Sequence, residues 1–379
     1  MNSKMTRRTM IKTTGGTLAM ALTPSAAASS STATSGGTMK AAVIERAGVD
    51  VASNVRVVGD WPEPAPGAGQ VRVRTEAAAL NHVDLWVGRS ESRSFPHVTG
   101  FDGCGTIESV GEGVDETWLG RRIIFNAAVP QSEPIEPDGR PDRPPEIELI
   151  GSMMPGSMAE KFVVPVANVL DVGEADPIQG AAFALTFLTA WRMISTRARL
   201  KPNQTVLLTG IGGGVALAAL EIVRYIGSPI IVTSRHQWKL DTAVGLGAAH
   251  GILDQGQDWS EEVRDLTGGR GVDLCVDSVG KALHGKCIQS LAQGGTLTTC
   301  GATTGGDATS ELRDIFWKQL SILGSSMGNM DEFREVTALF RAGKLEPVID
   351  QVFPAADAAQ AYARLQAGEQ FGKVVVRWG

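Results

Sequence analysis

Residues 204–214, QTVLLTGIGGG, decide the fold of this chain. The first half, 205–209, is a short run of β-branched and aliphatic residues that is typical of a buried parallel strand. Residues 215–226, VALAALEIVRYI, follow the glycines with apolar side chains at helical spacing. The stretch therefore predicts a strand, a glycine turn and a helix in succession.

The glycine turn has the composition of a diphosphate site. Residues without a Cβ let backbone N–H groups approach phosphate oxygens at the positive end of a helix. Glycine clusters also occur in ordinary loops, so the turn alone does not decide the ligand. A second strand predicted at 229–233, PIIVT, adds the context of a dinucleotide-binding unit. We expect the diphosphate to contact Gly212, Gly213, Gly214 and Val215.

The end of the second predicted strand indicates which dinucleotide is bound. An acidic residue there would hold the ribose 2′-hydroxyl of NAD and repel a 2′-phosphate. This chain has Ser234 and Arg235 there and Lys239 nearby, which favour the 2′-phosphate of NADP(H). The alternative is that the two cations only face solvent at the start of a helix.

Length and composition fit a soluble α/β enzyme with two domains. The chain has 379 residues, of which 43% are hydrophobic, 20% are charged and 45 are glycine. The formal net charge of −6 provides no basic surface for nucleic acid. The four cysteines form no CxxC pair, and we expect small buried residues, neither metal ligands nor disulfide partners, at Cys104, Cys275, Cys287 and Cys300.

Residues 1–38 predict a leader segment separate from the fold. In TRRTMIK at 6–12, Arg7 and Arg8 are followed by two apolar residues and a lysine, and a mildly apolar run continues to Leu22. The pattern resembles a twin-arginine export signal, which predicts a periplasmic or exported protein. The run is too short and too rich in Thr and Gly for a stable membrane span. The alternative is a disordered extension before a translation start at Met39, which would leave the protein in the cytoplasm.

The remaining sequence divides into a β-rich part and an alternating part. Segments such as KAAVIERA and QVRVRTEAAAL alternate apolar and polar side chains, as half-buried strands do. Six prolines predict a loop at 130–145. An apolar helix is predicted at 177–193, and strands and helices alternate after it. This alternation predicts a doubly wound parallel sheet with helices on both faces.

These landmarks together resemble the medium-chain dehydrogenase/reductase superfamily over nearly everything after Met39. The matching segments are NHVDLW, PHVTGFDGCGTIESVGEGV, GSMAEKFVVP, LTFLTAW, VLLTGIGGGVA, IIVTSR and PVIDQVFPAADAAQAYARLQAGEQFGKVVVRW. The resemblance implies an α/β fold in which a GroES-like β-rich catalytic domain, 39–170 with 335–379, accompanies a doubly wound Rossmann domain, 171–334, that binds NADP(H). It also implies a homodimer paired through the edge of the Rossmann sheet at 321–327.

The chain departs from the zinc-dependent branch of that superfamily at the metal ligands. Asn81, Phe101 with Asp102, and Leu185 stand where that branch has Cys, a His-Glu pair and Cys. Phe101 and Leu185 offer no lone pair, and Asp102 alone cannot hold a tetrahedral zinc. The proline-rich loop has none of the four cysteines of a structural zinc site. The chain is therefore similar to the zinc-independent, quinone oxidoreductase-like branch.

A hydride acceptor that needs no metal must already stabilise negative charge. Quinones and alkenes conjugated to a carbonyl do so by delocalising the charge onto oxygen. The expected function is therefore NADPH-dependent reduction of such a small molecule. Two alternatives remain, an NADP(H)-binding sensor or structural protein without turnover and a metal-free alcohol dehydrogenase. Tyr225 and Tyr362 lie outside the catalytic tyrosine position of enoyl-thioester reductases, which makes that activity less favoured.

The resemblance places the catalytic residues at Asn81, His82 and Asp84. Asn81 replaces a zinc ligand and is expected to hydrogen-bond the acceptor oxygen, unless it only caps a turn. His82 is expected to face the cofactor phosphates, unless it is a surface residue. Asp84 is expected to order its own turn through backbone hydrogen bonds. Thr189 in LTAW is expected beside the nicotinamide, unless it is an ordinary buried helix threonine.

Two further segments are expected at the cofactor. Cys300, Gly301 and Ala302 follow the fifth predicted strand, at the edge of the sheet where the cleft should lie. Gly372 and Lys373 in FGKVV match a turn that closes on the cofactor. The substrate-binding loops carry no pattern that identifies the substrate.

Overall fold

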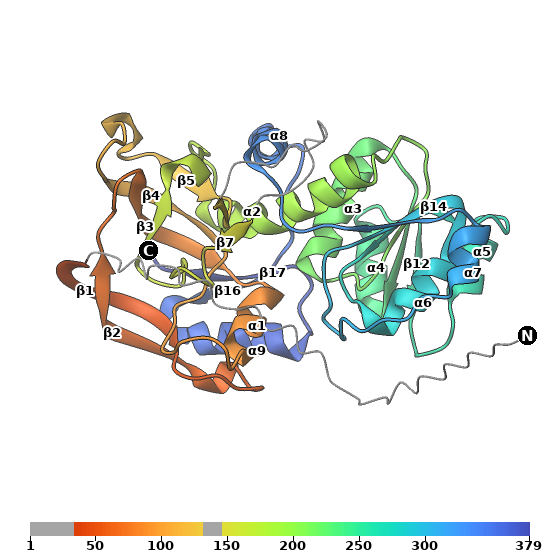
Figure 1. Ribbon diagram of the computed structural model, residues 1–379, viewed down its shortest axis with the longest axis horizontal. Helices are drawn as coiled ribbons and strands as arrows, with labels where there is room; N and C mark the ends of the chain where they lie inside the picture. Colours follow the sequence, from red (N-terminus) through yellow and green to blue (C-terminus); the bar gives the residue numbers. More distant parts are fainter. Residues whose placement is uncertain (1–33, 132–145) are drawn as a thin grey trace, which may run out of the picture. The chain divides into compact units, whose positions relative to one another are not determined.

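The computed structural model describes residues 34–131 and 146–379 (Figure 1). The expected twin-arginine segment and the greater part of the predicted proline-rich loop lie outside these residues. The described residues all belong to one compact unit. Within the described ranges, no helix is both long enough and apolar enough to cross a membrane.

Six parallel strands form one sheet in the order β12-β11-β10-β13-β14-β15. The order changes direction between β10 and β13, the point at which doubly wound sheets bind ligands. The strand and helix predicted on either side of the glycine turn are both present, as β10 and α3. The strands of this sheet are β10 Val206–Leu208, β11 Ile230–Ser234, β12 His250–Leu253, β13 Val272–Asp277, β14 Leu291–Thr299 and β15 Ser321–Gly324.

Helices cover both faces of this sheet. The uniformly apolar sequence of β10 follows from this arrangement, because side chains on both of its faces are buried. Val206 and Leu208 lie in one buried cluster with residues of α3 and α4, whereas Leu207 lies in another with residues of α5 and α6. Both faces of the strand are therefore dry, as expected for a parallel sheet. Helices α5, α6 and α7 lie together (Figure 1). The helices are α3 Gly214–Ile226, α4 Gln237–Gly245, α5 Ser260–Leu266, α6 Lys281–Ser290 and α7 Leu312–Trp317.

The second large sheet combines strands from the first half of the chain with the last two strands, β16 and β17. Its order is β16-β17-β3-β4-β5-β9, with β8 paired to β3. The C-terminal strand β17 runs antiparallel to β3, with Val375 opposite Ala79. Its strands are β3 Gln70–Ala79, β4 Asp102–Val110, β5 Arg122–Phe125, β8 Lys161–Pro165, β9 Val169–Asp171, β16 Ile349–Pro354 and β17 Lys373–Arg377. Two small antiparallel sheets add β1 Thr34–Ile44, β2 Val55–Pro64, β6 Ala128–Pro130 and β7 Ile147–Leu149.

Helix α2, Pro177–Trp191, connects the cores of the two large sheets. It packs on β3 and β4 and also on α3 and α8. Its first turn is capped by Asp176, whose side chain accepts hydrogen bonds from two backbone N–H groups. The remaining helices are α1 His82–Arg89, α8 Met330–Arg341 and α9 Ala358–Ala367.

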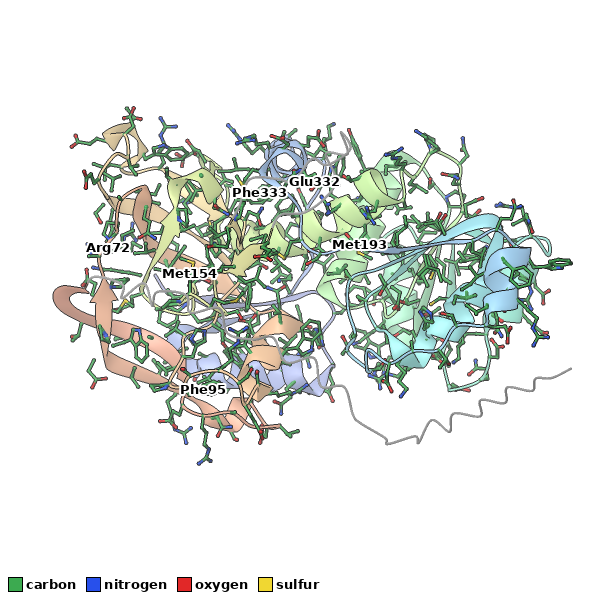
Figure 2. The ribbon with its side chains drawn as sticks, in the orientation of Figure 1. Arg72, Phe95, Met154, Met193, Glu332 and Phe333 are labelled. Atoms are coloured by element: carbon green, nitrogen blue, oxygen red, sulfur yellow. The ribbon has the colours of Figure 1, made fainter. Side chains whose placement is uncertain are left out.

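The end of α2 is fastened to α8 through Glu332, which Figure 2 labels together with its neighbour Phe333. Glu332 accepts hydrogen bonds from Arg192 Nη1 at 2.7 Å and from Thr196 Oγ1 at 2.5 Å. Arg192 and Glu332 are both buried. The ion pair therefore attaches the residue that follows α2 to the first turn of α8.

Candidate active site

A cleft of about 490 Å³ lies at the carboxyl ends of the parallel strands. Its wall includes the glycine turn after β10, the end of β11 and the residues that follow β14. Segments outside the parallel sheet complete the cleft, namely the start of α1, part of α2 and the turn before β17. Doubly wound sheets bind ligands in this position.

The glycine turn leaves the start of α3 open to the cleft. Gly213 precedes the helix, Gly214 begins it, and no side chain caps its first N–H groups. Both glycines and Val215 line the cleft. These uncapped N–H groups and the helix dipole fit a diphosphate. Gly212 does not line the cleft and is buried behind the turn, with a φ of +109° that favours glycine.

The three residues expected at the 2′-phosphate, Ser234, Arg235 and Lys239, all line the cleft. Arg235 is exposed, whereas Ser234 and Lys239 are buried. Lys239 Nζ donates to the carbonyl oxygen of Gly368 at 2.9 Å. Burial, and then the nearby Arg235, lower the pKa of Lys239. Arg235 is therefore the residue of this group with the most freedom to meet a phosphate.

Thr189 is buried on α2 and lines the cleft. Its Oγ1 has no hydrogen-bond partner within the described part of the chain. A buried hydroxyl without a partner is unfavourable, so such groups commonly await a ligand or water. The position fits the carboxamide of a nicotinamide. Thr186, one turn earlier on α2, also lines the cleft and was not expected from the sequence.

The residues after β14 divide between this cleft and a neighbouring hollow. Cys300 and Gly301 line both spaces, whereas Ala302 lines only the hollow, which has a volume of about 1180 Å³. Cys300 is therefore at the cleft wall, not fully buried as its sequence suggested, while the other three cysteines are buried. Burial, and then Asp277, raise the pKa of Cys300 to about 12. Its thiol is therefore not a ready nucleophile.

Asn81 corrects one expectation about the acceptor. It precedes α1 and forms a capping box with Asp84. Its Nδ2 donates to Asp102 Oδ2 at 2.9 Å and to the carbonyl oxygen of Ala79 at 3.4 Å. Both amide N–H groups are therefore engaged inside the protein, and Asn81 has no donor left for an acceptor oxygen.

Asp84 stabilises the turn at Asn81 and does not line the cleft. Its side chain is fully buried and accepts hydrogen bonds from Asn81 N at 2.8 Å and Gly100 N at 2.9 Å. Burial raises the pKa of Asp84 to about 6, against the opposing effect of these hydrogen bonds. The structure thus gives Asp84 the ordering contacts expected of it, and no contact with the cleft.

His82 begins α1, is half-buried and lines the cleft. Burial is the main reason that its pKa lies below the usual value, and the positive charges of Arg89 and Lys373 lower it further. The imidazole is therefore neutral at physiological pH. It is a cleft residue and not a surface histidine.

Lys373, expected in a turn that closes on the cofactor, has its ammonium paired inside the protein. Its Nζ donates to Asn81 Oδ1 at 2.6 Å and to Asp102 Oδ2 at 2.8 Å. Lys373 and Asp102 are buried, and Lys373 lines the cleft. Gly372, beside it, donates its N–H to the carbonyl oxygen of Gly212 at 3.0 Å and so attaches this turn to the glycine turn.

The cleft wall next to Lys373 is mainly apolar. Trp86 lines the cleft and also the neighbouring hollow, and 39% of its surface is exposed. The other apolar residues of this wall are Leu80, Val83, Phe101, Leu149, Leu185 and Met327. The arrangement suits an apolar molecule that presents a polar group to the Lys373 end of the cleft.

The residues at this end do not fit a tetrahedral zinc. Phe101 packs in a hydrophobic cluster, and Leu185 contributes only its backbone N–H, which donates to Asp102 Oδ1 at 2.7 Å. The ammonium of Lys373 lies against the remaining oxygens of Asn81 and Asp102, where a second cation would be repelled. Across residues 34–131 and 146–379, no three His, Cys, Asp or Glu side chains are grouped as a metal site.

Comparison with known proteins agrees with this architecture. Residues 67–174 match the family described as alcohol dehydrogenase GroES-like domain, and residues 246–376 match the family described as zinc-binding dehydrogenase. A solved structure described as an NAD-dependent alcohol dehydrogenase is 36% identical with a TM-score of 0.83, covering 90% of this chain and 100% of its own. The chain therefore belongs to the medium-chain dehydrogenase/reductase superfamily, and its α/β fold with GroES-like and Rossmann-type parts is confirmed.

Two curated relatives indicate the chemistry of the class. A zinc-type alcohol dehydrogenase-like protein YogA of Leptosphaeria maculans is 29% identical over 334 residues, 83% of this chain and 92% of that protein. A quinone oxidoreductase of Rattus norvegicus is 25% identical over 332 residues, 85% of this chain and 93% of that protein. The protein is accordingly an oxidoreductase of a nicotinamide-dependent fold.

Proposed function

We propose that this protein is a zinc-independent, NADPH-dependent reductase of a quinone or of an alkene conjugated to a carbonyl. One observation carries the proposal: Lys373, and no set of metal ligands, forms the polar end of an apolar cleft that begins at an uncapped helix terminus. A metal alkoxide is not available at such an end, so the acceptor must delocalise negative charge by itself. Similarity to a quinone oxidoreductase supports this choice.

In this proposal the residues of the cleft position two molecules. The dinucleotide, when bound, supplies a hydride from the nicotinamide ring. Gly213 and Gly214 hold its diphosphate at the start of α3, and Thr189 orients the carboxamide. Phe101, Leu185 and their apolar neighbours exclude water from the acceptor. Positioning of this kind supplies a large part of the rate in a reaction without a metal.

We propose NADP(H) as the cofactor because of the end of β11. Ser234 and Arg235 stand where a carboxylate would select NAD, and Arg235 is exposed toward the cleft. The relative described as NAD-dependent makes this a specific claim about this chain and not about its class. Equal affinity for NADH and NADPH would contradict it.

The test of the function is turnover with a panel of acceptors. Purified protein is mixed with NADPH and with quinones and enones of graded electron affinity, and the loss of nicotinamide absorbance is followed. We expect acceptor-dependent oxidation of NADPH. Binding of NADPH without turnover on any acceptor would favour a sensor or structural role, and reduction of NADP⁺ by alcohols would favour a metal-free alcohol dehydrogenase.

We also propose that residues 1–38 direct export through a twin-arginine pathway. The motif around Arg7 and Arg8 supports this, and an exported protein that carries a dinucleotide would use a route for folded chains. Replacing both arginines by lysine should keep the protein in the cytoplasm. A mature N-terminus at Met39 in the cytoplasm would support the internal start.

We propose a homodimer through the edge strand β15. This strand ends the parallel sheet on one side, and Ile322 within it is 38% exposed. Helix α7, which precedes it, exposes Leu312, Phe316 and Trp317 at 69%, 60% and 80%. Such a group of large apolar side chains favours an interface. Sedimentation of the wild type and of a Trp317→Glu variant tests it, with a monomer expected only for the variant.

A further inference from the structure

We propose that Lys373 performs the electrophilic role that a metal has elsewhere in this superfamily. Held by Asp102 and Asn81, its ammonium donates a hydrogen bond to the acceptor oxygen and stabilises the negative charge that develops there. The acceptor is thereby defined as an apolar carbonyl compound whose oxygen reaches the buried end of the cleft. This inference rests on the proposed function.

The hydrogen-bond geometry of Lys373 leaves one donor for a ligand. An ammonium has three N–H groups. Two of them serve Asn81 Oδ1 at 2.6 Å and Asp102 Oδ2 at 2.8 Å. Lys373 has only 4% of its side-chain surface exposed, yet it lines the cleft. The remaining N–H is therefore available to donate a hydrogen bond to an oxygen that enters the cleft. Because the side chain is buried, bulk water competes little for this N–H.

Asp102 is fixed so firmly that it can hold the ammonium in place. Its side chain is fully buried, with Oδ1 accepting from Leu185 N at 2.7 Å and Oδ2 accepting from Asn81 Nδ2 at 2.9 Å. Ser157 Oγ donates to the backbone carbonyl oxygen of Asp102 at 2.6 Å. A donor that is oriented before the reaction stabilises developing charge most effectively.

The position of Lys373 also relates it to the cofactor turn. A Cβ placed on Gly214 would lie 3.1 Å from Lys373 Cδ, so the lysine stem passes directly beside the first residue of α3. The acceptor side is apolar, with Phe101 and Leu185 lining the same cleft. Low polarity strengthens the attraction between an ammonium and a developing oxyanion. Lys373 thus lies between the expected diphosphate site and the expected acceptor site.

The reaction balances without a metal. The C–H bond at C4 of the dihydronicotinamide breaks, and its hydride forms a new C–H bond at the β-carbon of the enone. The electron pair of the alkene shifts toward the carbonyl group, which leaves an enolate. Lys373 stabilises the enolate oxygen while it remains charged, and a proton from water completes the saturated ketone. NADPH is oxidised and the enone is reduced by two electrons. For a quinone, the hydride and one proton from water together complete the hydroquinone.

The experiment compares Lys373→Met with Lys373→Arg and with Lys344→Met, which removes an exposed lysine at the end of α8. We expect Lys373→Met to lower kcat/KM by about 100-fold to 1000-fold, as loss of an oxyanion donor does. The loss should be greater for a weakly electron-poor enone than for a strongly electron-poor quinone, and Lys373→Arg should restore part of it. The affinity for NADPH, measured by its fluorescence, should stay within about threefold, since no phosphate contact is lost.

Three results would overturn the inference. Loss of NADPH affinity parallel to the loss of kcat/KM would make Lys373 a cofactor residue. An equal loss on all acceptors would make its role structural. The double variant Lys373→Met with Asp102→Asn guards against misfolding, because it leaves no unpaired buried carboxylate; full activity in that variant would also overturn the inference.

A second readout does not depend on turnover, so failure of the inference and failure of the proposed function can be distinguished. 4-Nitrophenol is an oxyanion probe whose ionisation is visible in its absorbance. Bound to the protein with NADP⁺, it should ionise at lower pH in the wild type than in Lys373→Met. No difference between the two proteins would overturn the role of Lys373. A difference without turnover of any acceptor would retain the oxyanion site and reject the reductase.

Discussion

The Nζ of Lys373 lies 2.8 Å from Oδ2 of Asp102, and the two side chains are 4% and 0% exposed. The contact joins the start of β17 to the start of β4, more than 270 residues apart in the sequence. Buried pairs of this kind are seldom favourable in themselves, because both charges lose their hydration. Stability alone therefore does not account for the pair, and its place beside the cleft fits the functional role proposed for Lys373.

Removing one partner of this pair should be costly. Asp102→Ala leaves the ammonium of Lys373 buried without its counter-charge, and we expect a loss of about 3–5 kcal/mol in the free energy of unfolding. Urea unfolding followed by circular dichroism measures it. A double variant Asp102→Leu with Lys373→Met should recover the greater part of the loss. A change below about 1 kcal/mol in the single variant, the range of exposed ion pairs, would show that the pair is not buried.

Thr189 should matter for binding and not for stability. Its Oγ1 has no partner in the described residues, so Thr189→Val removes no internal hydrogen bond. We expect the free energy of unfolding to stay the same or rise slightly, while the dissociation constant for NADPH rises by roughly tenfold. Calorimetric titration and thermal unfolding supply the two numbers. Thr337→Val on α8, a buried threonine that does not line the cleft and whose Oγ1 also has no partner in the described residues, is the matched control, and an equal effect of both changes would remove the nicotinamide assignment.

Arg235 should decide between the two dinucleotides. Arg235→Ala removes an exposed guanidinium that faces the expected 2′-phosphate, and we expect NADPH to bind about 10-fold to 100-fold more weakly, with NADH almost unchanged. The ratio of the two dissociation constants is the quantity to measure. Lys344→Ala, at an exposed position that does not line the cleft, should leave that ratio unaltered. Equal weakening of both dinucleotides would contradict the predicted preference.

Asp84 should make stability depend on pH in a specific direction. Its pKa in the folded chain is about 6, above the unfolded value of 3.8, so the folded state holds the proton more tightly between these values. Its contribution therefore falls as the pH rises from about 4 to about 6, by at most about 3 kcal/mol. The difference in unfolding free energy between wild type and Asp84→Asn should decrease over this range. A constant difference would mean that Asp84 is not desolvated as the structure shows.

Much of the fold followed from local patterns in the sequence. Residues 205–209 and 215–226 predicted a buried strand and a helix because apolar periodicity and glycine placement are local properties. The structure confirms them as Val206–Leu208 and Gly214–Ile226. The strand order of the second large sheet could not be derived from local patterns, because the pairing of β17 with β3 connects segments about 300 residues apart.

The site was harder to predict because its contacts are not local. Nothing in the sequence around Asp102 and Lys373 indicates that the two side chains pair. Asn81 was expected to face the acceptor because its hydrogen-bond partners, Asp102 and Lys373, could not be identified from the sequence. Two features of the sequence were available as signals for this site. The zinc-ligand positions hold no complete set of ligands, and the segment FGKVV contains a lysine. Trp86 and Met327 gave none, since an aromatic or a methionine in an apolar segment is ordinary core composition.

Oxidation of NADPH by protein stripped of metals with a strong chelator tests whether the reaction proceeds without a metal, with 1,4-naphthoquinone and cyclohexenone as acceptors. We predict acceptor-dependent oxidation at the same rate before and after the treatment, without stimulation by added zinc. Loss of activity on chelation with recovery on addition of zinc would contradict it, as would a stoichiometric zinc content in the untreated protein.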